Sequence, residues 1–399
     1  MAQRATRLTI ILLVLAGLAG FAPAGVRAAT RPHGQANGAM GIAHGAHLRP
    51  VYVPPPSEYG YGDEILAFDS LAGKDLAVVM YFLDWTGAPP DHAFDSFLVH
   101  LIQSEISDPA RRPAVMLTWQ PMKQNNSYGC TKSYNGVIPP ADIIAGNCDA
   151  YITQFAKDLK ARPERFLLRF AHEMNITDSP WWPGHFGGDA SLYVNMWHHV
   201  YDVFSQQGAV NVEWVWSPNY ASNPPDAWNN IHNYYPGNAY VDWIGLSGYN
   251  WYVSPGHNQP WRTFDYLYDA VLKDLACSYA KPQMIAEIGS VEGGGSVPTK
   301  SQWIADTYQK ATSYPFLRAI VWFNDYAMAS PALADFRVTT STAQDGSVSP
   351  LPAVTHAWTN AYAEAIAGAG YSTRLPSLAD ATPASTFCGY STYLPLILR

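Results

Sequence analysis

Polar residues at the ends of two apolar runs have the types that acid–base and nucleophilic chemistry require. The run "RFLLRFAHEMN" (165–175) ends in His172, Glu173 and Asn175, and "PQMIAEIGS" (282–290) carries Glu287 near its end. Two carboxyl groups in one pocket can divide the work, because one can stay protonated while the other stays ionised. Burial and neighbouring charges separate two such pKa values. We therefore predict that Glu173 and Glu287 form a catalytic pair.

Two unrelated structural glutamates are the competing interpretation, disfavoured because an unpaired buried acid is costly. The residue types alone favour catalysis only modestly over an ion-pair network. In a regular strand, Arg169 and Glu173 face the same side and His172 faces the other, so the strand must bulge or end for His172 to reach a shared site. Arg169 would then need a carboxylate partner. The catalytic interpretation also requires that neither Glu is bound permanently by Arg or Lys.

Alternation with helical segments indicates how these residues are positioned. Eight short apolar runs recur: 38–46, 75–85, 113–121, 165–175, 211–219, 241–250, 282–290 and 318–325. Segments with helical spacing lie between them, including 149–162, 190–208, 263–280 and 301–313. Strands that are apolar on both faces and alternate with helices predict a parallel sheet. Eight such units predict an α/β fold, a single (β/α)8 TIM barrel.

The predicted strands end in polar or aromatic residues, and active sites of such barrels lie at the carboxyl ends of the strands. In strand seven, Ile285, Glu287 and Gly289 are expected to share one face. Five tryptophans lie at strand ends or in the loops that follow them, and as a set they predict a cleft where sugar rings stack. They are Trp85, Trp119, Trp181, Trp182 and Trp251.

The first residues read as a secretory signal peptide. Arg4 and Arg7 precede a short apolar run, and small residues follow it, so we expect cleavage after Ala28. The run is shorter than a membrane span of about 20 residues. We predict a signal peptide over 1–28, a linker over 29–37, the barrel over 38–370 and a C-terminal tail over 371–399. The mature protein should be an extracellular monomer.

The net charge of the chain argues against two classes of partner. Removal of residues 1–28 takes away three Arg and no acid, which changes the formal net charge from -8 to -11. An acidic chain without Lys or Arg clusters argues against nucleic acid and anionic membranes.

The cysteines of an exported protein suggest two disulfides. Three pairings are possible; we favour Cys130 with Cys148, which leaves Cys277 with Cys388.

No metal or cofactor motif is evident. "HEMNI" (172–176) begins like the zinc motif HExxH, but Ile176 stands where the second His is required, so the motif fails. His198 and His199 are adjacent on a predicted helix and cannot face one metal together. No Cys has a second metal-ligand partner nearby. We expect neither a metal nor a cofactor.

The sequence resembles glycoside hydrolase family 26, whose best-known members are β-mannanases. The similarity rests on "RFAHEMN" (169–175) and "AEIGS" (286–290), and extends over about residues 38–340. It implies a retaining mechanism with Glu173 as acid/base and Glu287 as nucleophile, their carboxyl groups about 5–5.5 Å apart. It further implies that His172 contacts substrate, that Tyr249 hydrogen-bonds the nucleophile and that Trp322 forms an aromatic floor. Asn175 belongs to the same motif and to the predicted site.

Two departures from the family pattern leave the substrate open. "ITDSPWWPG" (176–184) follows "HEMN" where the family usually has Gly and an aromatic loop, and the loop 122–140 is long. The polysaccharide substrate is predicted to be β-1,4-mannan, cut internally. β-Xylan and mixed-linkage β-glucan are the alternatives, since the family includes enzymes for all three. A sugar-binding barrel without catalysis is the competing class, disfavoured because both acids are present.

Overall fold

The structure is a computed structural model, and it describes residues 41–48, 61–85, 87–88, 91–92, 106–122, 137–329, 332–339, 354–368 and 370–381. The predicted signal peptide and linker lie outside these residues. Cys130 and Cys388 also lie outside them.

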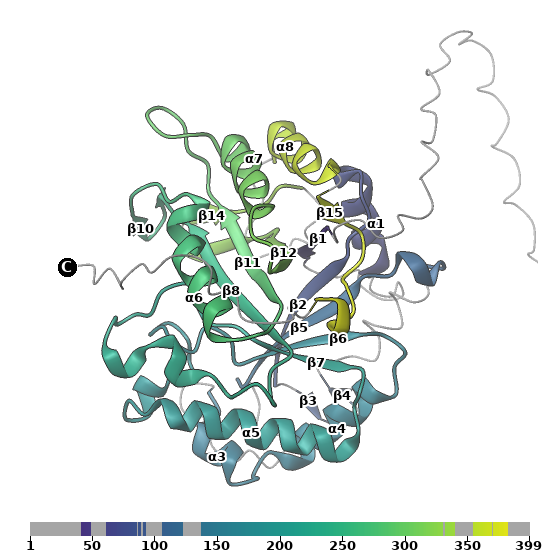
Figure 1. Ribbon diagram of the computed structural model, residues 1–399, viewed down its shortest axis with the longest axis vertical. Coiled ribbons are helices and arrows are strands. Elements are labelled where there is room, and N and C mark those ends of the chain that lie inside the picture. Colours follow the sequence, from purple (N-terminus) through teal and green to yellow (C-terminus); the bar gives the residue numbers. More distant parts are fainter. Residues whose placement is uncertain are drawn as a thin grey trace, which may run out of the picture. The chain divides into compact units, whose positions relative to one another are not determined.

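Eight parallel strands form a closed barrel, as the sequence predicts (Figure 1). Each of the eight predicted runs overlaps one of them; six runs contain the whole strand, while β1 ends one residue after its run and β12 begins one residue before its run. Their order is β12–β11–β8–β7–β6–β5–β2–β1, and pairing of β12 with β1 closes the barrel. The strands are β1 (Ile42–His47), β2 (Val78–Asp84), β5 (Ala114–Gln120), β6 (Phe166–Phe170), β7 (Val212–Trp216), β8 (Trp243–Asn250), β11 (Gln283–Ser290) and β12 (Leu317–Phe323).

Helices surround the barrel, and the four named predicted helical segments are all helical (Figure 1). The segment 263–280 differs in one respect, because it begins with a π-helical turn, η5 (Asp265–Asp269). The α-helices are α1 (Tyr61–Ala72), α3 (Pro140–Ile144), α4 (Asp149–Lys160), α5 (Ala190–Gln207), α6 (Ala270–Ser278), α7 (Lys300–Ala311), α8 (His356–Ala367) and α9 (Leu378–Ala381).

Short elements complete the described chain. The 3-10 turns are η1 (Pro109–Arg111), η2 (Pro183–Phe186), η3 (Ala227–Asn229) and η4 (Ile231–Tyr234). Three two-stranded pairs are β3 (Gly87–Ala88) with β4 (Asp91–His92), β9 (Val253–Ser254) with β10 (His257–Asn258), and β13 (Tyr326–Ala329) with β14 (Ala332–Asp335). β15 (Tyr371–Ser372) pairs with β1 outside the closed ring.

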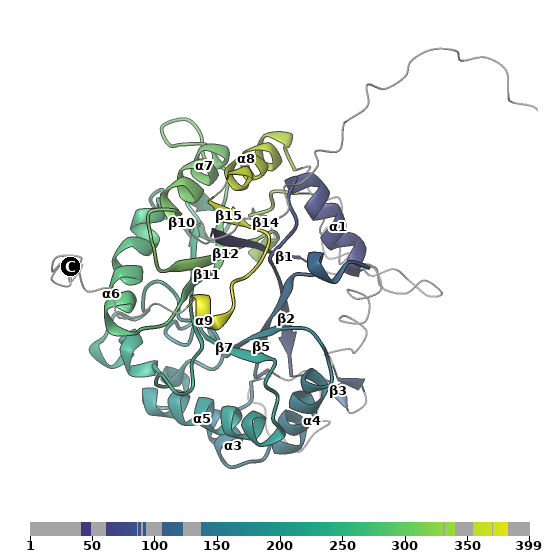
Figure 2. The ribbon, with the colours of Figure 1, turned by 45° about the vertical axis from the view of Figure 1, so that its right-hand side comes forward.

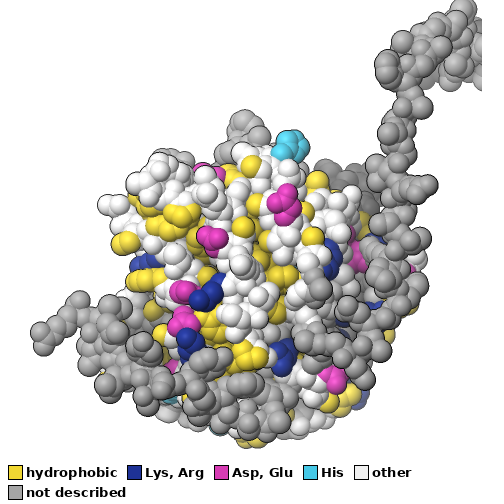
Figure 3. Space-filling view, turned by 45° about the horizontal axis from the view of Figure 1, so that its top comes forward, with side chains coloured by type: hydrophobic (Ala, Val, Ile, Leu, Met, Phe, Trp, Pro, Cys, Tyr) yellow, Lys and Arg dark blue, Asp and Glu magenta, His cyan; other side chains and the backbone are white. Residues whose placement is uncertain are grey.

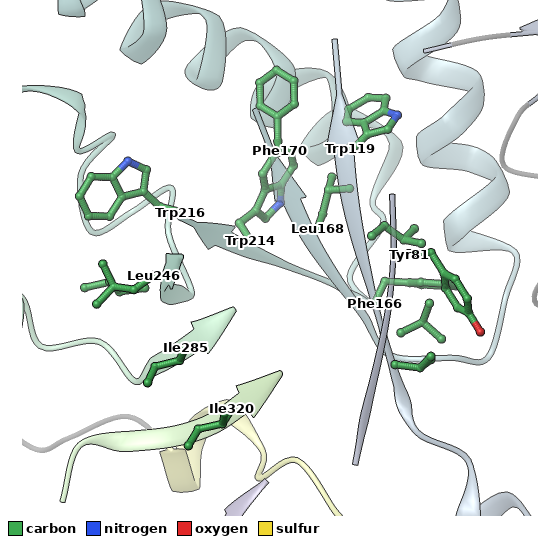
Figure 4. Close-up of a cluster of buried hydrophobic side chains, with 14 of the residues drawn as sticks. Tyr81, Trp119, Phe166, Leu168, Phe170, Trp214, Trp216, Leu246, Ile285 and Ile320 are labelled. Carbon is green, nitrogen blue, oxygen red and sulfur yellow. The ribbon is translucent and has the colours of Figure 1, made fainter. Parts of the chain in front are cut away.

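Strand alternation divides the core into two layers. Residues on one face of each strand pack inside the barrel, as Met116, Leu167 and Val321 do. Residues on the other face pack against the helices, as Leu168 and Ile320 do (Figure 4). Both faces are therefore apolar, which explains why the strands read as continuous hydrophobic runs. Polar side chains inside the barrel are correspondingly unusual and mark the site.

The predicted tail is partly integrated into the barrel. Leu375, Leu378 and Ala381 pack against the hydrophobic cluster inside the barrel, and Figure 2 shows α9 in front of the strands. Arg165 donates to the carbonyls of Leu375 and Pro376, at 3.2 and 2.7 Å. This segment covers the amino ends of the strands, so the expectation that residues from 371 on form only a tail is wrong up to residue 381.

The cysteines give a mixed outcome. Cys148 is disulfide-bonded, but its predicted partner lies outside the described residues, so the Cys130–Cys148 pairing stays a prediction. Cys277 on α6 carries a thiol. The predicted link from Cys277 to Cys388 is therefore not present in this structure.

Basic side chains are spread thinly over one face of the described surface (Figure 3). On the face shown in Figure 3, Lys and Arg side chains are scattered singly among acidic and uncharged ones. No helix in the described ranges is long and apolar enough to cross a membrane.

Candidate active site

Glu173 and Glu287 lie at the carboxyl ends of the barrel strands. Glu173 follows β6, and Glu287 lies in the C-terminal half of β11. The two acids are close enough that the charge of Glu287 raises the pKa of Glu173. Two side chains far apart in sequence thus meet because parallel strands bring their carboxyl ends to one rim.

A β-bulge turns Glu287 into the barrel. Ile285 pairs with Leu246, but Glu287 pairs with the very next residue of β8, Ser247, so β11 has one extra residue here. The register with β12 shifts over the same stretch. As a result, Ile285 packs outside, against the helices, while Glu287 faces inward. The prediction that Ile285 and Glu287 share one face is wrong, because regular alternation breaks at the bulge.

Arg169 is the cation inside the barrel, and its carboxylate partner is Glu287. The guanidinium is fully buried and donates to Ser217 Oγ at 2.9 Å, Thr118 Oγ1 at 3.2 Å and Ser247 Oγ at 2.5 Å. Its Nη1 also donates to Glu287 Oε1. Three hydroxyls, from β5, from β8 and from the residue that follows β7, therefore set the orientation of the guanidinium, and the guanidinium in turn orients the carboxylate.

Both oxygens of Glu287 accept hydrogen bonds. Arg169 donates to Oε1, and the Tyr249 hydroxyl donates to Oε2; the expected contact from Tyr249 is present. Burial and the charge of Glu287 raise the pKa of Tyr249 well above its ordinary value, so this hydroxyl keeps its proton. His172 Nε2 lies 3.9 Å from Oε1.

The contact between Arg169 and Glu287 corrects the requirement, made from the sequence, that neither catalytic acid has a permanent Arg or Lys partner. A permanent Arg partner was expected to disqualify either carboxylate. For a nucleophile that requirement is too strict, because a nucleophile must be ionised and a neighbouring cation stabilises the ionised form. Each carboxylate oxygen also has two lone pairs, so the contact with Arg169 leaves acceptor capacity on Glu287.

Glu173 is held by a strained turn at the end of β6. The strand ends at Phe170, and Ala171 and Glu173 have φ of 44° and 53°, a region that residues other than glycine rarely adopt. The Glu173 N–H donates to Ser217 O at 2.8 Å. The sequence required this strand either to bulge or to end for His172 to reach the site. The strand ends, at Phe170, and His172 thereby reaches the site.

Glu173 has the electrostatics of a general acid. Burial raises its pKa to about 7, and the charge of Glu287 adds to the shift, while Arg169 and hydrogen bonds from Asn219 and Ser247 oppose it. Asn219 Nδ2 donates to Glu173 Oε1 at 3.2 Å. A carboxylic acid that keeps its proton close to neutral pH can donate it to a departing oxygen.

The raised pKa of Glu173 predicts a stability cost that depends on pH. The folded-state value, about 7, exceeds the ordinary value of 4.5, so the unfolded chain gives up this proton more easily. Stability is therefore lost as pH rises from 4.5 through 7. We expect Glu173→Gln to be as stable as the wild type below pH 4.5, and more stable by up to about 3 kcal/mol above pH 7.

Urea unfolding at pH 4 and pH 8 measures this difference. Glu364→Gln makes the same chemical change on the exposed surface of α8 and serves as the control, with equal effects at both pH values. A Glu173→Gln variant whose stability relative to the wild type does not change between the two pH values would show that Glu173 ionises normally.

Asn175 lies behind the acid. It is fully buried; its Oδ1 accepts from the Asn219 N–H at 2.8 Å, and its Nδ2 donates to Asn219 O at 3.0 Å. Asn219 is the residue that donates to Glu173. Asn175 has no exposed atom that could contact a substrate, so the predicted substrate-binding role does not fit. Its hydrogen bonds with Asn219 indicate a positioning role instead.

His172 is neutral. Burial, with the nearby charge of Arg169, lowers the pKa of His172 well below its ordinary value. Its ring packs between Phe82 and Trp181, with centroid distances of 5.8 and 5.3 Å. Within the described residues its Nδ1 is buried without a hydrogen-bond partner. Contact of His172 with substrate remains a proposal.

Several tryptophans expected at the sugar site are core residues. Trp119 is 0% exposed and stacks on Phe155 with a centroid distance of 4.5 Å; Figure 4 shows it near Phe170 in the hydrophobic cluster. Trp85, 4% exposed, packs on Trp119 at 4.5 Å. Neither ring has a free face for a sugar, so both predictions are wrong. Trp85 and Trp119 both lie on the side of the strands that faces the helices, as the alternation of side chains along the strands requires.

Trp181 and Trp322 support the site from behind. Trp181 is 1% exposed and donates from Nε1 to His172 O at 2.6 Å. Trp322 is 0% exposed and donates from Nε1 to Phe336 O at 2.9 Å. Neither can contact a sugar, which corrects both predictions. The inward ring at the end of β12 is Phe323, which lies 5.6 Å from Tyr249.

Trp182 and Trp251 are the half-buried tryptophans among the predicted site residues. Trp182 lies 5.5 Å from Trp228 and donates from Nε1 to Asn229 Oδ1 at 3.0 Å. Trp251 stacks on His257 at 4.1 Å. Both lie in loops after barrel strands, so sugar stacking remains a proposal for these two.

Some site residues were not found from the sequence. Ser247 and Thr118 face inward beside Arg169, and the alternation of their strands could have revealed them. Phe323 follows the same rule, because Ala319 and Val321 pack inside the barrel. Asn219 ends a predicted strand, but only the structure shows that it reaches Glu173. The described residues include no group of three or more His, Cys, Asp or Glu arranged to hold a metal.

Comparison with known proteins supports a particular family. Residues 132–301, which include both acids, match the model for glycosyl hydrolase family 26. A curated relative, endoglucanase H of Acetivibrio thermocellus, is 31% identical over 264 residues, which cover 65% of this chain and 26% of that protein. This chain therefore matches about a quarter of that relative's length.

Two solved structures share the fold. One is a β-mannanase from Bacteroides ovatus, with a TM-score of 0.53, 17% identity and coverage of 83% of this chain and 90% of that chain. The other is a β-mannanase from a symbiotic protist of the termite Reticulitermes speratus, complexed with gluco-manno-oligosaccharide. It has a TM-score of 0.51, 19% identity and coverage of 86% and 90%. At these identities the likeness concerns the fold alone.

Proposed function

We propose that this chain, whose residues 132–301 match the model for glycosyl hydrolase family 26, is a retaining glycosidase of that family that cuts β-linked polysaccharides at internal bonds. The observation that carries the proposal is the difference between its two acids. Glu173 has a pKa raised to about 7, whereas Glu287 is buried against Arg169 and Tyr249. Glu173 is set to hold a proton, and Glu287 is held in place by a guanidinium and a hydroxyl donor.

In the first step, Glu287 attacks the anomeric carbon while Glu173 gives its proton to the glycosidic oxygen. The carbon–oxygen bond breaks, the leaving sugar departs with its new hydroxyl, and a glycosyl ester forms on Glu287. In the second step, the ionised Glu173 takes a proton from water, and the water oxygen attacks the same carbon and releases Glu287. Two inversions give net retention.

The surrounding residues have supporting roles in this mechanism. Arg169 and Tyr249 hold the carboxylate of Glu287 in one orientation, which limits the reorganisation needed for attack. Asn175 positions Asn219, which holds Glu173. We propose that His172, Trp182 and Trp251 contact the sugar.

The substrate has two leading candidates. β-1,4-Mannan is the prediction from the family resemblance. The relative at 31% identity is named an endoglucanase, and this similarity favours a β-glucan. β-Xylan is the third candidate. All of them are neutral β-linked chains, which suit an acidic protein without basic clusters.

A substrate panel tests the proposal. Purified protein is incubated with soluble β-1,4-mannan, mixed-linkage β-glucan and β-xylan, and reducing ends and product lengths are measured. We expect reducing ends from the β-glucan or the mannan, released as oligosaccharides of several lengths. Binding without new reducing ends on all three polymers would favour a sugar-binding barrel that lacks catalysis.

We also propose that the protein is exported and acts outside the cell as a monomer without a cofactor. Support for export comes from the basic and apolar pattern of residues 1–28, and from a cysteine content suited to an oxidising compartment. Edman sequencing of the secreted protein should begin at residue 29.

A further inference from the structure

We propose that Lys300 is a positioning residue for the reaction, although it lies outside the catalytic site. By holding residues 335–337 in place, Lys300 keeps Phe336 against Tyr249 and so keeps the Tyr249 hydroxyl on Glu287. The inference rests on the proposed role of Glu287 as nucleophile.

Lys300 is a buried lysine whose hydrogen bonds go to main-chain carbonyls. It is the first residue of α7 and is 0% exposed. Its Nζ donates to Asp335 O at 3.0 Å and Arg337 O at 2.7 Å, and lies 4.1 Å from the centroid of the Trp358 ring. Burial of an ammonium group is costly, and here it serves to fix one segment of backbone.

Those two carbonyls flank a single residue, Phe336. The Phe336 N–H donates to Asp325 O at 3.0 Å, and its own carbonyl accepts from Trp322 Nε1 at 2.9 Å. The Asp335 and Arg337 side chains form an ion pair at 2.7 Å. The backbone on both sides of Phe336 is therefore tied to α7 and to the end of β12.

The Phe336 ring packs directly on the nucleophile's partner. Its centroid lies 5.0 Å from that of Tyr249 and 4.9 Å from that of Trp251. A Cβ at Gly289 would lie 2.9 Å from the Phe336 ring, so glycine is required there for the ring to approach. Phe336 is 0% exposed and fills the space behind Tyr249.

The path from Lys300 to Glu287 is thus a continuous series of contacts. Lys300 holds the backbone of Phe336, the ring of Phe336 packs on Tyr249, and the Tyr249 hydroxyl donates to Glu287. Displacement of a catalytic contact by 1 Å can lower the rate by about 100-fold. Release of residues 335–337 should therefore displace the Tyr249 hydroxyl and reduce turnover, although no residue of the site itself is substituted.

Lys300→Met tests the proposal, because it keeps most of the side-chain volume and removes the donors. We expect kcat to fall about 10- to 100-fold in the wild-type background. In the Tyr249→Phe background the hydroxyl is already absent, so Lys300→Met should change kcat by less than about 2-fold. Equal losses in both backgrounds would overturn the proposal, since a purely structural role predicts them.

Lys74→Met is the matched control. Lys74 Nζ also donates to main-chain carbonyls, those of Ile366 at 2.7 Å and Tyr371 at 2.6 Å, but it precedes β2, at the opposite end of the barrel strands. Its loss should lower the unfolding temperature and leave kcat unchanged. All assays are run well below the unfolding midpoints of every variant.

Urea unfolding of the same variants separates this inference from the proposed function. Lys300→Met and Tyr249→Phe should have non-additive effects on the free energy of unfolding, whereas Lys74→Met and Tyr249→Phe should be additive. If the wild type is inactive on every polymer, the proposed function fails. The unfolding free energies of the two single variants and the double variant still show whether Lys300 and Tyr249 are coupled. Additivity of the Lys300 and Tyr249 variants would refute the coupling.

Discussion

Replacement of Glu287 by Ala should lower kcat by roughly 10⁵-fold or more, because the proposed nucleophile is lost. Replacement of Glu173 by Ala should cost about 10²- to 10⁴-fold, the usual contribution of acid–base catalysis. Glu173→Ala should fold, since it removes a group whose burial is unfavourable. Glu287→Ala leaves the buried Arg169 without its carboxylate partner, so it should be less stable than the wild type, and its rate is measured under conditions where urea unfolding shows it to be folded. Initial rates on the best polymer of the panel give the comparison.

Azide distinguishes the two roles by the stereochemistry of the product. In Glu287→Ala, azide can enter the space of the missing carboxylate and attack the anomeric carbon once, which gives an α-glycosyl azide. In Glu173→Ala, an aryl glycoside with a good leaving group still forms the ester on Glu287, and azide then gives a β-glycosyl azide. Proton NMR identifies each anomer.

The exposed Glu364→Ala on α8 is the control and should retain full activity without any azide product. If either active-site variant kept most of its turnover, its assignment would be wrong. If the two azide products were exchanged, the roles of Glu173 and Glu287 would be reversed.

Replacement of Arg169 by Met should destabilise the fold by about 3–5 kcal/mol, since it leaves the buried Glu287 charge without its partner. Turnover should fall as well, because Glu287 would lose the contact that orients it. Arg169 is 0% exposed and Glu287 is 4% exposed, so water cannot easily replace the lost contact. Urea unfolding at pH 7 measures the change.

The double variant Arg169→Met/Glu287→Gln tests the cause. Removal of both charges should recover much of the lost stability. If the double variant is as unstable as Arg169→Met, the loss comes from the hydroxyl partners Thr118, Ser217 and Ser247. Arg165→Met is the control, because its pair with Glu213 is partly exposed and should contribute less.

The barrel could be predicted because its signal is local. Each strand is apolar on both faces and each helix has its own spacing, so the eight units are visible in short windows of sequence. The inward direction of Arg169 follows from alternation along one strand. Its partner was not predictable, because a carboxylate was required but several were available.

The remaining differences depend on contacts between distant segments. The bulge before Glu287 is visible only against the registers of β8 and β12. Trp322 and Phe323 are adjacent aromatics, and the strand's placement in the barrel decides which one faces the site. Residues 371–381 have a Pro- and Ser-rich composition that is typical of a tail, yet the hydrophobic interior of the barrel gives them a place to pack.

The amino-acid sequence alone was sufficient for the strand–helix alternation and for the two acids at strand ends, because both follow from near neighbours along the chain. Closure of the barrel decided which acid keeps a proton and which is held by Arg169. That difference arises from burial and from charges on other strands, and no single segment contains it.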